Sequence, residues 1–328
     1  MIGVQLAIKI GLIGYRNHSA RLLQLLEQRS DCEINFIYHP TKLFNDPRIT
    51  NNLSELLKCD AILIASPNHT HYGYLENLLE NFKGYIFCEK PPVSSLTEIE
   101  KLENLDVEKK SRLFFNFNYR FSNINNNLKS QLNSDVIGKI IHINMIYTHG
   151  LAFKKEYLNS WRADGKKNLH NIAETVSIHY LDLLNLHFGN AKKLFYFPRL
   201  ISENGTSYDT DYFTIQFEDG VTASILNSYA SPSMDEITII GTNGYFTIKN
   251  NELSIYSPRD TFNSKGFFIS PPIVYKHSFS MENDYQDSLQ KSLDYFILHV
   301  KEKTPIDLDH FNASIRTNKM ILNLTNQE

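Results

Sequence analysis

The sequence predicts a two-domain protein: a Rossmann-type, doubly wound parallel α/β sheet followed by an α+β domain with a large, mainly antiparallel open sheet. The chain of 328 residues is long enough for two domains. In its first part, short apolar runs alternate with helical patterns, and after about Asn118 longer strands of alternating polarity follow one another with turn signals between them. We expect residues 1–120 to form the first domain and residues 121–328 the second.

The first domain begins with a buried strand and continues with strand and helix segments in turn. Parallel strands need a crossover connection, which is usually a helix, so helical segments between apolar strands indicate a parallel sheet. Two segments have apolar residues at helical spacing. The expected helices are 20–26 and 74–82, and the expected strands are 7–13, 34–38, 61–65 and 85–88.

The second domain is expected to consist of consecutive hairpins with helical cover. The triplets at 218–220 and 242–244 each end in glycine and stand where hairpin turns belong. Segment 168–187 is rich in Leu and Ile at helical spacing and would cover one face of the sheet, and 281–300 is again helical in pattern. The expected strands include 139–148, 211–217, 221–228 and 236–240.

Charge and hydropathy restrict the class of partner. The formal net charge is -3, with acidic and basic residues mixed along the chain, so no basic block is present that would attract nucleic acid or a membrane surface. No apolar run approaches the roughly 20 residues of a membrane-spanning helix. Residues 1–14 lack a basic start and contain Lys9, which favours a buried strand over a signal peptide. We expect a cytoplasmic protein with a small-molecule partner.

Metal and nucleophilic chemistry find no support in the residue spacing. The three cysteines are odd in number and far apart, which excludes a disulfide framework and a Cys-x-x-Cys zinc site. His69 and His71 have no carboxylate or Cys at ligand spacing, and we expect no metal. Neither a Gly-x-Ser-x-Gly elbow nor a phosphate-binding loop with the Walker pattern occurs.

The end of the first strand carries glycines that favour a dinucleotide site. In such a fold this turn opens a helix whose free N–H groups bind the pyrophosphate. The Gly-x-Gly-x-x-Gly fingerprint is incomplete, because Arg16 and Ser19 replace its second and third glycines. Arg16 is able to pair with phosphate oxygens, whereas the alternative is a plain turn. The cofactor-binding residues expected here are Gly11, Gly14, Tyr15, Arg16 and Asn17.

The residues after the second strand bear on the choice between NAD and NADP. NAD-binding proteins usually have a carboxylate here that bonds the adenosine ribose. This chain has Tyr38-His39-Pro40-Thr41-Lys42 instead. His39 and Lys42 are suited to a 2′-phosphate, which favours NADP, with NAD and a solvated loop as the alternatives.

Three further segments carry a family resemblance: 65–71, which reads Ala-Ser-Pro-Asn-His-Thr-His, 88–91, which reads Cys-Glu-Lys-Pro, and 116–121, which reads Asn-Phe-Asn-Tyr-Arg-Phe. In this order and spacing they resemble the glucose–fructose oxidoreductase/inositol dehydrogenase/rhizopine catabolism (Gfo/Idh/MocA) oxidoreductase family. The likeness extends to 137–140, 161–162 and 240–244, and so covers nearly the whole chain. It implies a Rossmann domain followed by a C-terminal sheet domain.

The resemblance implies a set of residues around the nicotinamide. Lys90 is expected to be catalytic as well, because an ammonium partly removed from water beside a cationic nicotinamide is suited to proton exchange with a substrate hydroxyl. Its alternative is a surface lysine before a Pro-Pro turn. The residues carried over are Ser66, Pro67, Asn68, His71, Glu89, Lys90, Asn118, Trp161, Arg162 and Tyr285.

In the second domain, family members commonly place an Asp four residues before a His on one helix, so that both side chains face the substrate. Here Thr175 stands at the Asp position and Ser177 where a glycine is usual, while His179 keeps its place. Thr175 can hydrogen-bond a hydroxyl but carries no charge. We expect His179 and Thr175 to be catalytic, and the alternative for His179 is a histidine hydrogen-bonded in the domain core.

These residues lead to a functional hypothesis and an alternative. The resemblance implies an NADP- or NAD-dependent enzyme that moves a hydride at a hydroxyl or keto carbon of a sugar, cyclitol or nucleotide-linked sugar, with Lys90 and His179 flanking one crevice. The alternative is a degenerate relative that binds a nucleotide or sugar as a sensor or assembly partner. An antiparallel sheet with one uncovered face also predicts a homodimer or homotetramer through the C-terminal sheet.

Overall fold

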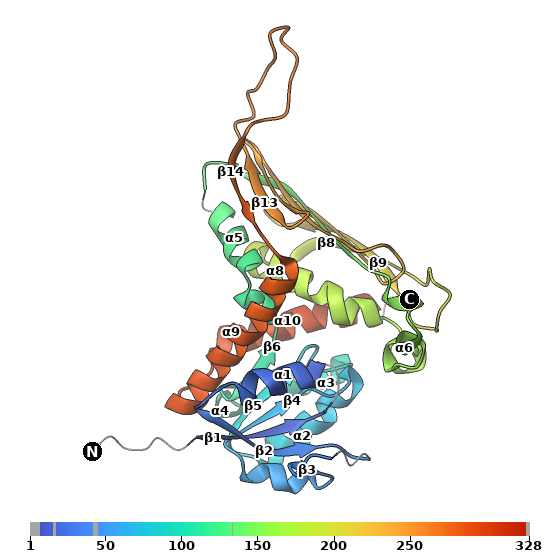
Figure 1. Cartoon of the computed structure of the whole chain (residues 1–328), viewed down its shortest axis with the longest axis vertical. Coiled ribbons are helices and arrows are strands. Elements are labelled where there is room, and N and C mark those ends of the chain that lie inside the picture. Colours follow the sequence, from blue (N-terminus) through green and yellow to red (C-terminus); the bar gives the residue numbers. More distant parts are fainter. Residues whose placement is uncertain (1–6, 16–17, 42–44, 133, 326–328) are drawn as a thin grey trace, which may run out of the picture. The chain divides into compact units, whose positions relative to one another are not determined.

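The computed structural model describes residues 7–15, 18–41, 45–132 and 134–325 (Figure 1). The chain divides into two compact units. Unit 1 consists of Met1–Phe117 together with Leu289–Glu328, and unit 2 of Asn118–Ser288. Among the described residues, no helix is both long enough and apolar enough to span a membrane.

Unit 1 contains a six-stranded, fully parallel sheet of order β3-β2-β1-β4-β5-β6. The order reverses direction between β1 and β4, which is the switch point where doubly wound sheets bind ligands. This confirms the predicted fold class. The strands are β1 (Ile8–Ile13), β2 (Cys32–Tyr38), β3 (Ile49–Thr50), β4 (Ala61–Ile64), β5 (Tyr85–Glu89) and β6 (Leu113–Asn116).

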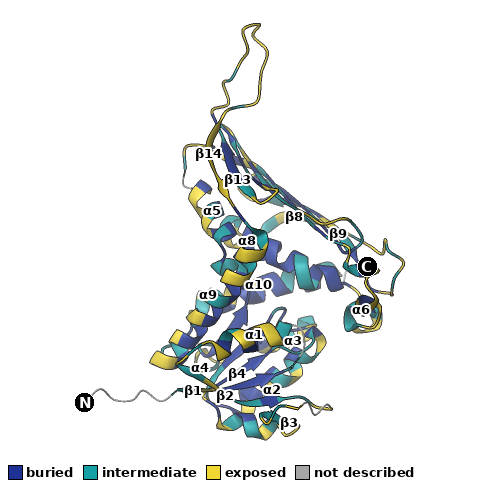
Figure 2. Ribbon diagram, in the orientation of Figure 1, coloured by how far each residue is buried: buried dark blue, intermediate teal, exposed yellow. Residues whose placement is uncertain are grey.

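Helices cover the sheet of unit 1, and its central strands are therefore apolar throughout. All four residues of β4 are buried, and this strand and β5 are dark in Figure 2. In the first helix Leu22 and Leu26 are buried at helical spacing, as the sequence predicts. The helices are α1 (His18–Glu27), η1 (Leu53–Lys58), η2 (Asn68–Thr70), α2 (His71–Asn81), α3 (Leu96–Glu103) and α4 (Val107–Lys110).

The two C-terminal helices are α9 (Met281–Glu302) and α10 (Leu308–Thr325), and their assignment to the units differs from the predicted domain boundary. The chain from Leu289 onward belongs to unit 1, although the sequence predicts a second domain that runs to residue 328. Aromatic packing is the reason: Phe114 of β6 stacks on His310 with ring centroids 4.5 Å apart and contacts Phe296 at 5.9 Å. Helical periodicity predicts α9, but it does not tell which sheet the helix covers.

Unit 2 contains an eight-stranded sheet of order β14-β13-β12-β11-β7-β10-β9-β8, in which β7 and β10 are parallel and the other neighbours antiparallel. The predicted hairpin turns after β9 and β11 are both confirmed. The strands are β7 (Ile140–Thr148), β8 (Ala191–Arg199), β9 (Thr210–Phe217), β10 (Thr222–Ser228), β11 (Met234–Gly241), β12 (Tyr245–Lys249), β13 (Glu252–Tyr256) and β14 (Ile273–Ser278).

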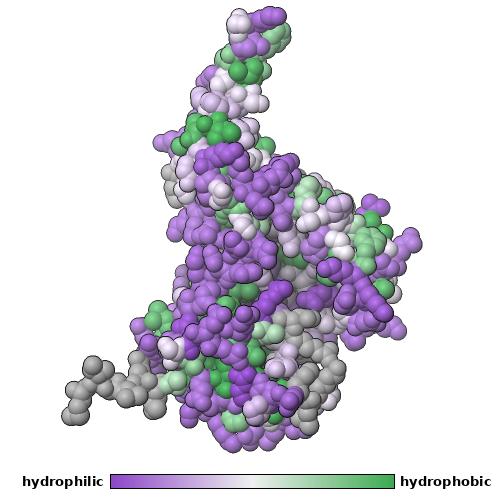
Figure 3. All heavy atoms as spheres, viewed as in Figure 1, coloured by the Kyte–Doolittle hydropathy of each residue, from purple (hydrophilic) through white to green (hydrophobic). Residues whose placement is uncertain are grey.

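Helices lie on one face of this sheet, and the other face is open (Figure 1). The inward residues of β9 are buried and alternate with more accessible ones. Figure 3 shows apolar side chains on the long hairpin between β13 and β14. The helical elements are η3 (Asn118–Phe121), α5 (Asn123–Leu132), η4 (Leu151–Phe153), α6 (Lys155–Leu158), η5 (Trp161–Ala163), α7 (Gly165–Asn168), η6 (Ala173–Ser177) and α8 (Ile178–Phe188).

Candidate active site

In unit 1 the turn after β1 has a backbone that requires glycine at Gly14. Its φ is +110°, and an added Cβ would lie 2.7 Å from the carbonyl oxygen of Ala65. Its N–H donates to the carbonyl of Tyr38 at 3.1 Å. Gly11 lies inside β1, where a Cβ would come within 2.9 Å of Leu56 Cγ, so its missing side chain serves packing against η1.

Tyr15 and His39 flank this turn, and both are half-buried. The Nδ1 atom of His39 lies 3.4 Å from the backbone nitrogen of Thr41. The predicted residues Arg16, Asn17 and Lys42 lie outside the described residues. The expected contribution of Arg16 and Lys42 to phosphate binding therefore stays a prediction.

Glu89, at the end of β5, joins three elements of unit 1. Its Oε1 lies 2.8 Å from Nε2 of His18 at the start of α1 and accepts a hydrogen bond from the Asn116 amide at 2.7 Å. Burial raises the pKa of Glu89, but His18, Asn116 and Lys90 outweigh this effect, so the pKa lies below its usual value. The carboxylate therefore fixes the start of α1 against the Lys90 turn.

His71 fixes the loop after β4 to the turn after β5. Its ring is fully buried, with Nδ1 2.8 Å from the carbonyl of Pro91 and Nε2 2.8 Å from that of Ser66. Burial lowers the pKa of His71, although both carbonyls act in the opposite direction. The peptide bond between Lys90 and Pro91 is cis. The structure thus gives His71 the role of holding two loops together.

Asn68 is the polar group of this loop that the protein leaves unsatisfied. It is 7% exposed, and its Nδ2 has no hydrogen-bond partner among the described residues. Nearby, the hydroxyls of Ser66 and Thr70 lie 2.7 Å apart, and Thr70 donates to the carbonyl of Pro67. A buried amide without a partner is costly unless a ligand satisfies it.

In unit 2 a second group of predicted residues gathers around Tyr119. The Tyr119 ring stacks on His179, with centroids 4.4 Å apart, and Tyr285 approaches its edge at 6.4 Å. Asn118 is buried, and its amide donates to Ser288 Oγ at 2.7 Å. Burial raises the pKa of Tyr119 well above its usual value. His179, Asn118 and Tyr285 therefore share one neighbourhood within unit 2.

Arg120 and Asp182 fix this neighbourhood to α8. Arg120 donates from Nε and Nη2 to the two carboxylate oxygens of Asp182, at 2.7 and 2.6 Å, and the exposed fractions of the side chains are only 7% and 2%. A bidentate pair of this kind fixes both side chains. The sequence analysis missed this pair, although Arg120 lies in one of the segments that carry the resemblance.

Thr175 lies on a π-helical turn, η6, directly before α8. Its hydroxyl donates to the carbonyl of Asn171 at 2.6 Å and lies 2.7 Å from the hydroxyl of Tyr229. The arrangement that satisfies both contacts has Tyr229 donating to Thr175. A π-helical turn contains one residue more than an α-helical turn. Thr175 and His179 are four residues apart in sequence, but they therefore do not face the same side as they would on the regular α-helix that the sequence predicts.

A buried carboxyl group, Asp211, stands beneath this turn and was missed by the sequence analysis. Ser177 Oγ donates to its Oδ2 at 2.6 Å, and the Asn227 amide lies 3.3 Å from its Oδ1. Burial raises the pKa of Asp211 to about 7, against the effect of these hydrogen bonds. The alternating pattern of β9 could have predicted its burial, because Asp211 lies two and four residues before the inward-facing Phe213 and Ile215 and so points to the same face.

Trp161 and Arg162 lie together on η5, where the guanidinium carbon of Arg162 is 4.8 Å from the centroid of the Trp161 ring. This is a cation–π contact between neighbours in sequence. Both side chains are half-buried. Their expected contact with a cofactor stays a prediction.

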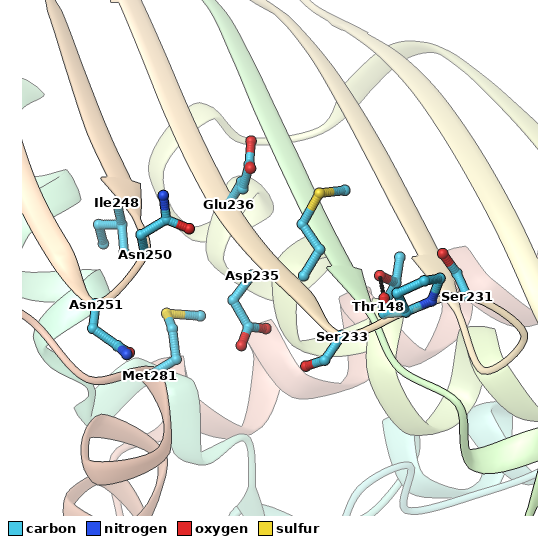
Figure 4. A pocket seen from close by; sticks show the side chains of 11 residues that line it. Thr148, Ser231, Ser233, Asp235, Glu236, Ile248, Asn250, Asn251 and Met281 are labelled. Atoms are coloured by element: carbon cyan, nitrogen blue, oxygen red, sulfur yellow. Dashed lines mark hydrogen bonds between the residues drawn. The ribbon is translucent and has the colours of Figure 1, made fainter.

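A pocket of about 500 Å³ opens at one end of the unit 2 sheet (Figure 4). Asp235 is in its wall, and burial raises the pKa of this carboxyl. None of the predicted site residues lines the pocket. Among the described residues, no three His, Cys, Asp or Glu side chains gather as a metal site. The lining includes Thr148, Ser231, Ser233, Asp235, Asn251 and Met281.

The structure therefore brings the predicted residues together in two groups. Gly14, Ser66, Asn68 and Lys90 follow the carboxyl ends of β1, β4 and β5 in unit 1, whereas the group around His179 lies in unit 2. Because Lys90 and His179 belong to different units, their common crevice stays a prediction.

Comparison with protein families matches both parts of the chain. The NAD-binding Rossmann model of the Gfo/Idh/MocA oxidoreductase family matches residues 8–117, and the model of the Gfo/Idh/MocA C-terminal domain matches residues 126–247. Together the two models match more than half of the chain.

Individual relatives are distant. Glucose-6-phosphate 3-dehydrogenase of Bacillus subtilis is 28% identical over 136 residues, which make up 40% of this chain and 38% of that protein. The chain spans about two fifths of the length of the curated relatives it matches.

Solved structures resemble the whole chain. A putative NADPH-dependent oxidoreductase from Desulfitobacterium hafniense has a TM-score of 0.77 at 17% identity, over 98% of this chain and 95% of that one. A myo-inositol dehydrogenase from Corynebacterium glutamicum has a TM-score of 0.69 at 18% identity, over 97% and 96%. These likenesses show the fold.

Proposed function

Because this chain belongs to the Gfo/Idh/MocA family of NAD-binding oxidoreductases, we propose that it transfers a hydride between a nicotinamide and a hydroxyl or keto carbon of a sugar, cyclitol or nucleotide-linked sugar. One observation carries the proposal: Gly14 and Asn68 follow the ends of β1 and β4, which flank the switch point of the unit 1 sheet, and Lys90 follows the end of the neighbouring strand β5. The substrate class is supported by relatives named as glucose-6-phosphate 3-dehydrogenase and myo-inositol dehydrogenase.

The residues of unit 1 fit a dinucleotide. Gly14 lets the turn after β1 approach the backbone of Ala65 closely, and the amide of Asn68 lacks a partner among the described residues. The turn at Gly14 and the start of α1 would hold the pyrophosphate, and Ser66, Pro67 and Asn68 the nicotinamide end. We keep NADP as the favoured form because His39, and no carboxylate, directly follows β2.

In the proposed reaction the bound nicotinamide supplies or accepts the hydride. We assign exchange of the hydroxyl proton to Lys90 Nζ, to the imidazole of His179, or to both. Thr175 would orient a substrate hydroxyl through its own hydroxyl, which Tyr229 and Asn171 hold in place. Since Thr175 carries no charge, the proton transfer falls to Lys90 and His179.

Cofactor titration and a substrate panel test the proposal. Nicotinamide fluorescence should report binding of NADPH or NADH, and turnover with sugars and cyclitols should follow. We expect Lys90→Ala to keep cofactor binding and to lower kcat by about 10²- to 10⁴-fold, the usual contribution of a general acid or base. Lys58→Ala is the matched control, because Lys58 is an exposed lysine of unit 1 paired with Glu55.

One result would revise the proposal, and another would contradict it. Full turnover by Lys90→Ala would remove Lys90 from the reaction. Failure of wild type to bind either dinucleotide would favour the alternative, a family member that acts as a sensor or assembly partner without chemistry.

We further propose that the open face of the unit 2 sheet joins a second copy of the chain in a homodimer or homotetramer. Large apolar side chains on this face are exposed, which is unusual unless a partner covers them. Light scattering in solution would measure the mass of the assembly. The side chains are Phe195, Phe197, Tyr212 and Ile240.

A further inference from the structure

A row of polar side chains crosses the sheet of unit 2 on the face that carries η6 and α8. The row follows register pairs: Asp235 of β11 faces Tyr147 of β7, Tyr147 faces Asn227 of β10, and Asn227 faces Asp211 of β9. Directly paired residues point to the same face of a sheet. The next row on that face is apolar and buried, so the polar row borders the core; it consists of Ile237, Met145, Ile225 and Phe213.

At the Asp211 end, this row meets the π-helical turn. Asp211, Asn227 and Ser177 are each 0% exposed. Ser177 Oγ donates to Asp211 Oδ2 at 2.6 Å and accepts from the Asn227 amide at 2.8 Å, and that amide also lies 3.3 Å from Asp211 Oδ1. Three side chains from a helix and two strands thus form a closed triangle without access to water, where hydrogen bonds are strong.

Ser177 is the last residue of the π-helical turn, and Thr175 lies within the same turn. The extra residue of such a turn changes the rotation between residues before and after it. The turn closes where the N–H of Ile178 bonds to the carbonyl of Ala173. A shift of Ser177 would therefore change the position of Thr175 relative to His179, which lies in the first turn of α8 and stacks on Tyr119.

We propose that Asp211 is a positioning residue of the reaction, which holds the π-helical turn through Ser177 and so sets the place of Thr175 relative to His179. Full burial keeps Asp211 itself away from any substrate. The inference rests on the proposed function for its effect on turnover, but the hold on the turn is a property of the protein alone.

The contact between Asp211 and Ser177 depends on whether Asp211 is protonated. Burial raises the pKa of Asp211 to about 7. The ionised carboxylate accepts from both Ser177 and Asn227. A protonated Asp211 donates to Ser177 Oγ instead, and the Ser177 hydrogen then turns to the carbonyl of Ile172 at 3.5 Å. The titratable side chains near Asp211 include Tyr147 and Asp235 in the same row and Tyr229 directly after β10. Asp209 directly precedes β9, and Glu174 lies in η6.

Hydrogen exchange of the segment 170–182, measured at pH 6 and pH 8 and corrected for the intrinsic rate, tests the hold directly. In wild type we expect the turn to exchange at least threefold faster at pH 8, because burial raises the pKa of Asp211 in the closed turn and its ionisation therefore favours opening. Asp211→Asn should remove this difference. Asp235→Asn is the matched control, since it changes another carboxyl of the same row with a pKa raised by burial, on β11, which is separated from β9 by β7 and β10.

Kinetics test the effect on the reaction. Asp211→Ala should lower kcat at least tenfold with KM changed less than twofold, and Asp211→Asn should restore most of kcat while losing the wild-type inflection of kcat near pH 7. If Asp211→Ala does not fold, Ser177→Ala removes the same contact and replaces it in the test.

The inference is overturned if Asp211→Asn keeps the pH dependence of exchange, or if Asp235→Asn removes it. It is also overturned if Ser177→Ala leaves kcat unchanged. A wild-type protein that binds no dinucleotide would instead overturn the proposed function alone, because the exchange experiment needs neither cofactor nor substrate.

Discussion

The two units hold their candidate site residues by different means. In unit 1 main-chain atoms dominate: the N–H of Gly14 bonds to a carbonyl of β2, and the ring of His71 lies between two carbonyls. In unit 2 side chains bind side chains from distant parts of the chain, in the pairs Arg120–Asp182, Ser177–Asp211 and Thr175–Tyr229. The difference teaches that the first site depends on backbone conformation and the second on which side chains the sheet register brings together.

Two buried carboxyl groups show the consequence. Glu89 of unit 1 has a pKa below its usual value, because His18 and Asn116 offset the effect of burial. Asp211 of unit 2 has neutral partners only in Ser177 and Asn227, and burial raises its pKa. Burial therefore opposes ionisation in both units, and the partner decides which effect wins.

The largest effect is expected for the charge pair of unit 2. Arg120→Ala would leave Asp182, which is 2% exposed, without its guanidinium partner. Leaving a buried charge uncompensated costs about 3–5 kcal/mol. Urea unfolding should show a loss of this size in the free energy of unfolding of the variant.

Replacing both Arg120 and Asp182 tests whether the loss of stability comes from a buried charge without a partner. We expect Arg120→Met combined with Asp182→Leu to lose less than Arg120→Ala, because apolar residues leave no charge buried. A double variant that loses as much as both single changes together would contradict this and would mean that the two side chains do not stabilise each other.

The fold was predicted from sequence wherever local pattern decides it. Apolar runs separated by helical periodicity predicted β1, β2, β4 and β5, and turn residues predicted the hairpin turns after β9 and β11 in unit 2. The two-residue strand β3 is too short for a pattern. The placement of α9 and α10 also lay beyond sequence reasoning, since it depends on contacts such as Phe114 with Phe296 between residues far apart in the chain.

The site was predicted unevenly for the same reason. Residues of unit 1 directly follow their strands, so motif and strand end coincide, as at Gly14 and Lys90. In unit 2 the π-helical turn adds one residue that periodicity does not reveal, and it displaces Thr175 from its expected relation to His179. Asp211 was overlooked because its partners come from cross-strand register rather than from its neighbours in sequence.

A smaller effect is expected for the backbone of unit 1. Gly14→Ala places a Cβ 2.7 Å from a carbonyl oxygen at a φ of +110°. Strain of this kind costs about 1–3 kcal/mol, and the displaced turn should weaken dinucleotide binding. Thermal unfolding and fluorescence titration measure the two effects.

Gly73→Ala is the matched control for the turn. Gly73 lies in α2, with no atom within 4 Å of an added Cβ. Alanine in a helix is better than glycine by about 0.5–1 kcal/mol, so this variant should be slightly more stable and bind the cofactor as wild type does. Equal loss in both variants would show that the backbone of Gly14 has no special role.

The smallest effect, and the sharpest contrast between the units, is expected in the pH dependence of stability. Because the pKa of Glu89 is lower in the folded protein, its ionised form stabilises the fold above its unfolded pKa, and this contribution is lost as the pH falls through the folded value. Glu89→Gln should therefore cost about 1 kcal/mol at pH 7 and progressively less toward acid pH. The pH dependence that Asp211 contributes has the opposite sign. Its contribution to the free energy of unfolding is complete below the unfolded pKa and is lost as the pH rises through the folded value of about 7. Urea unfolding from pH 4 to pH 8 of wild type, Glu89→Gln and Asp211→Asn separates the two, and slopes of the same sign for both carboxyls would refute the contrast.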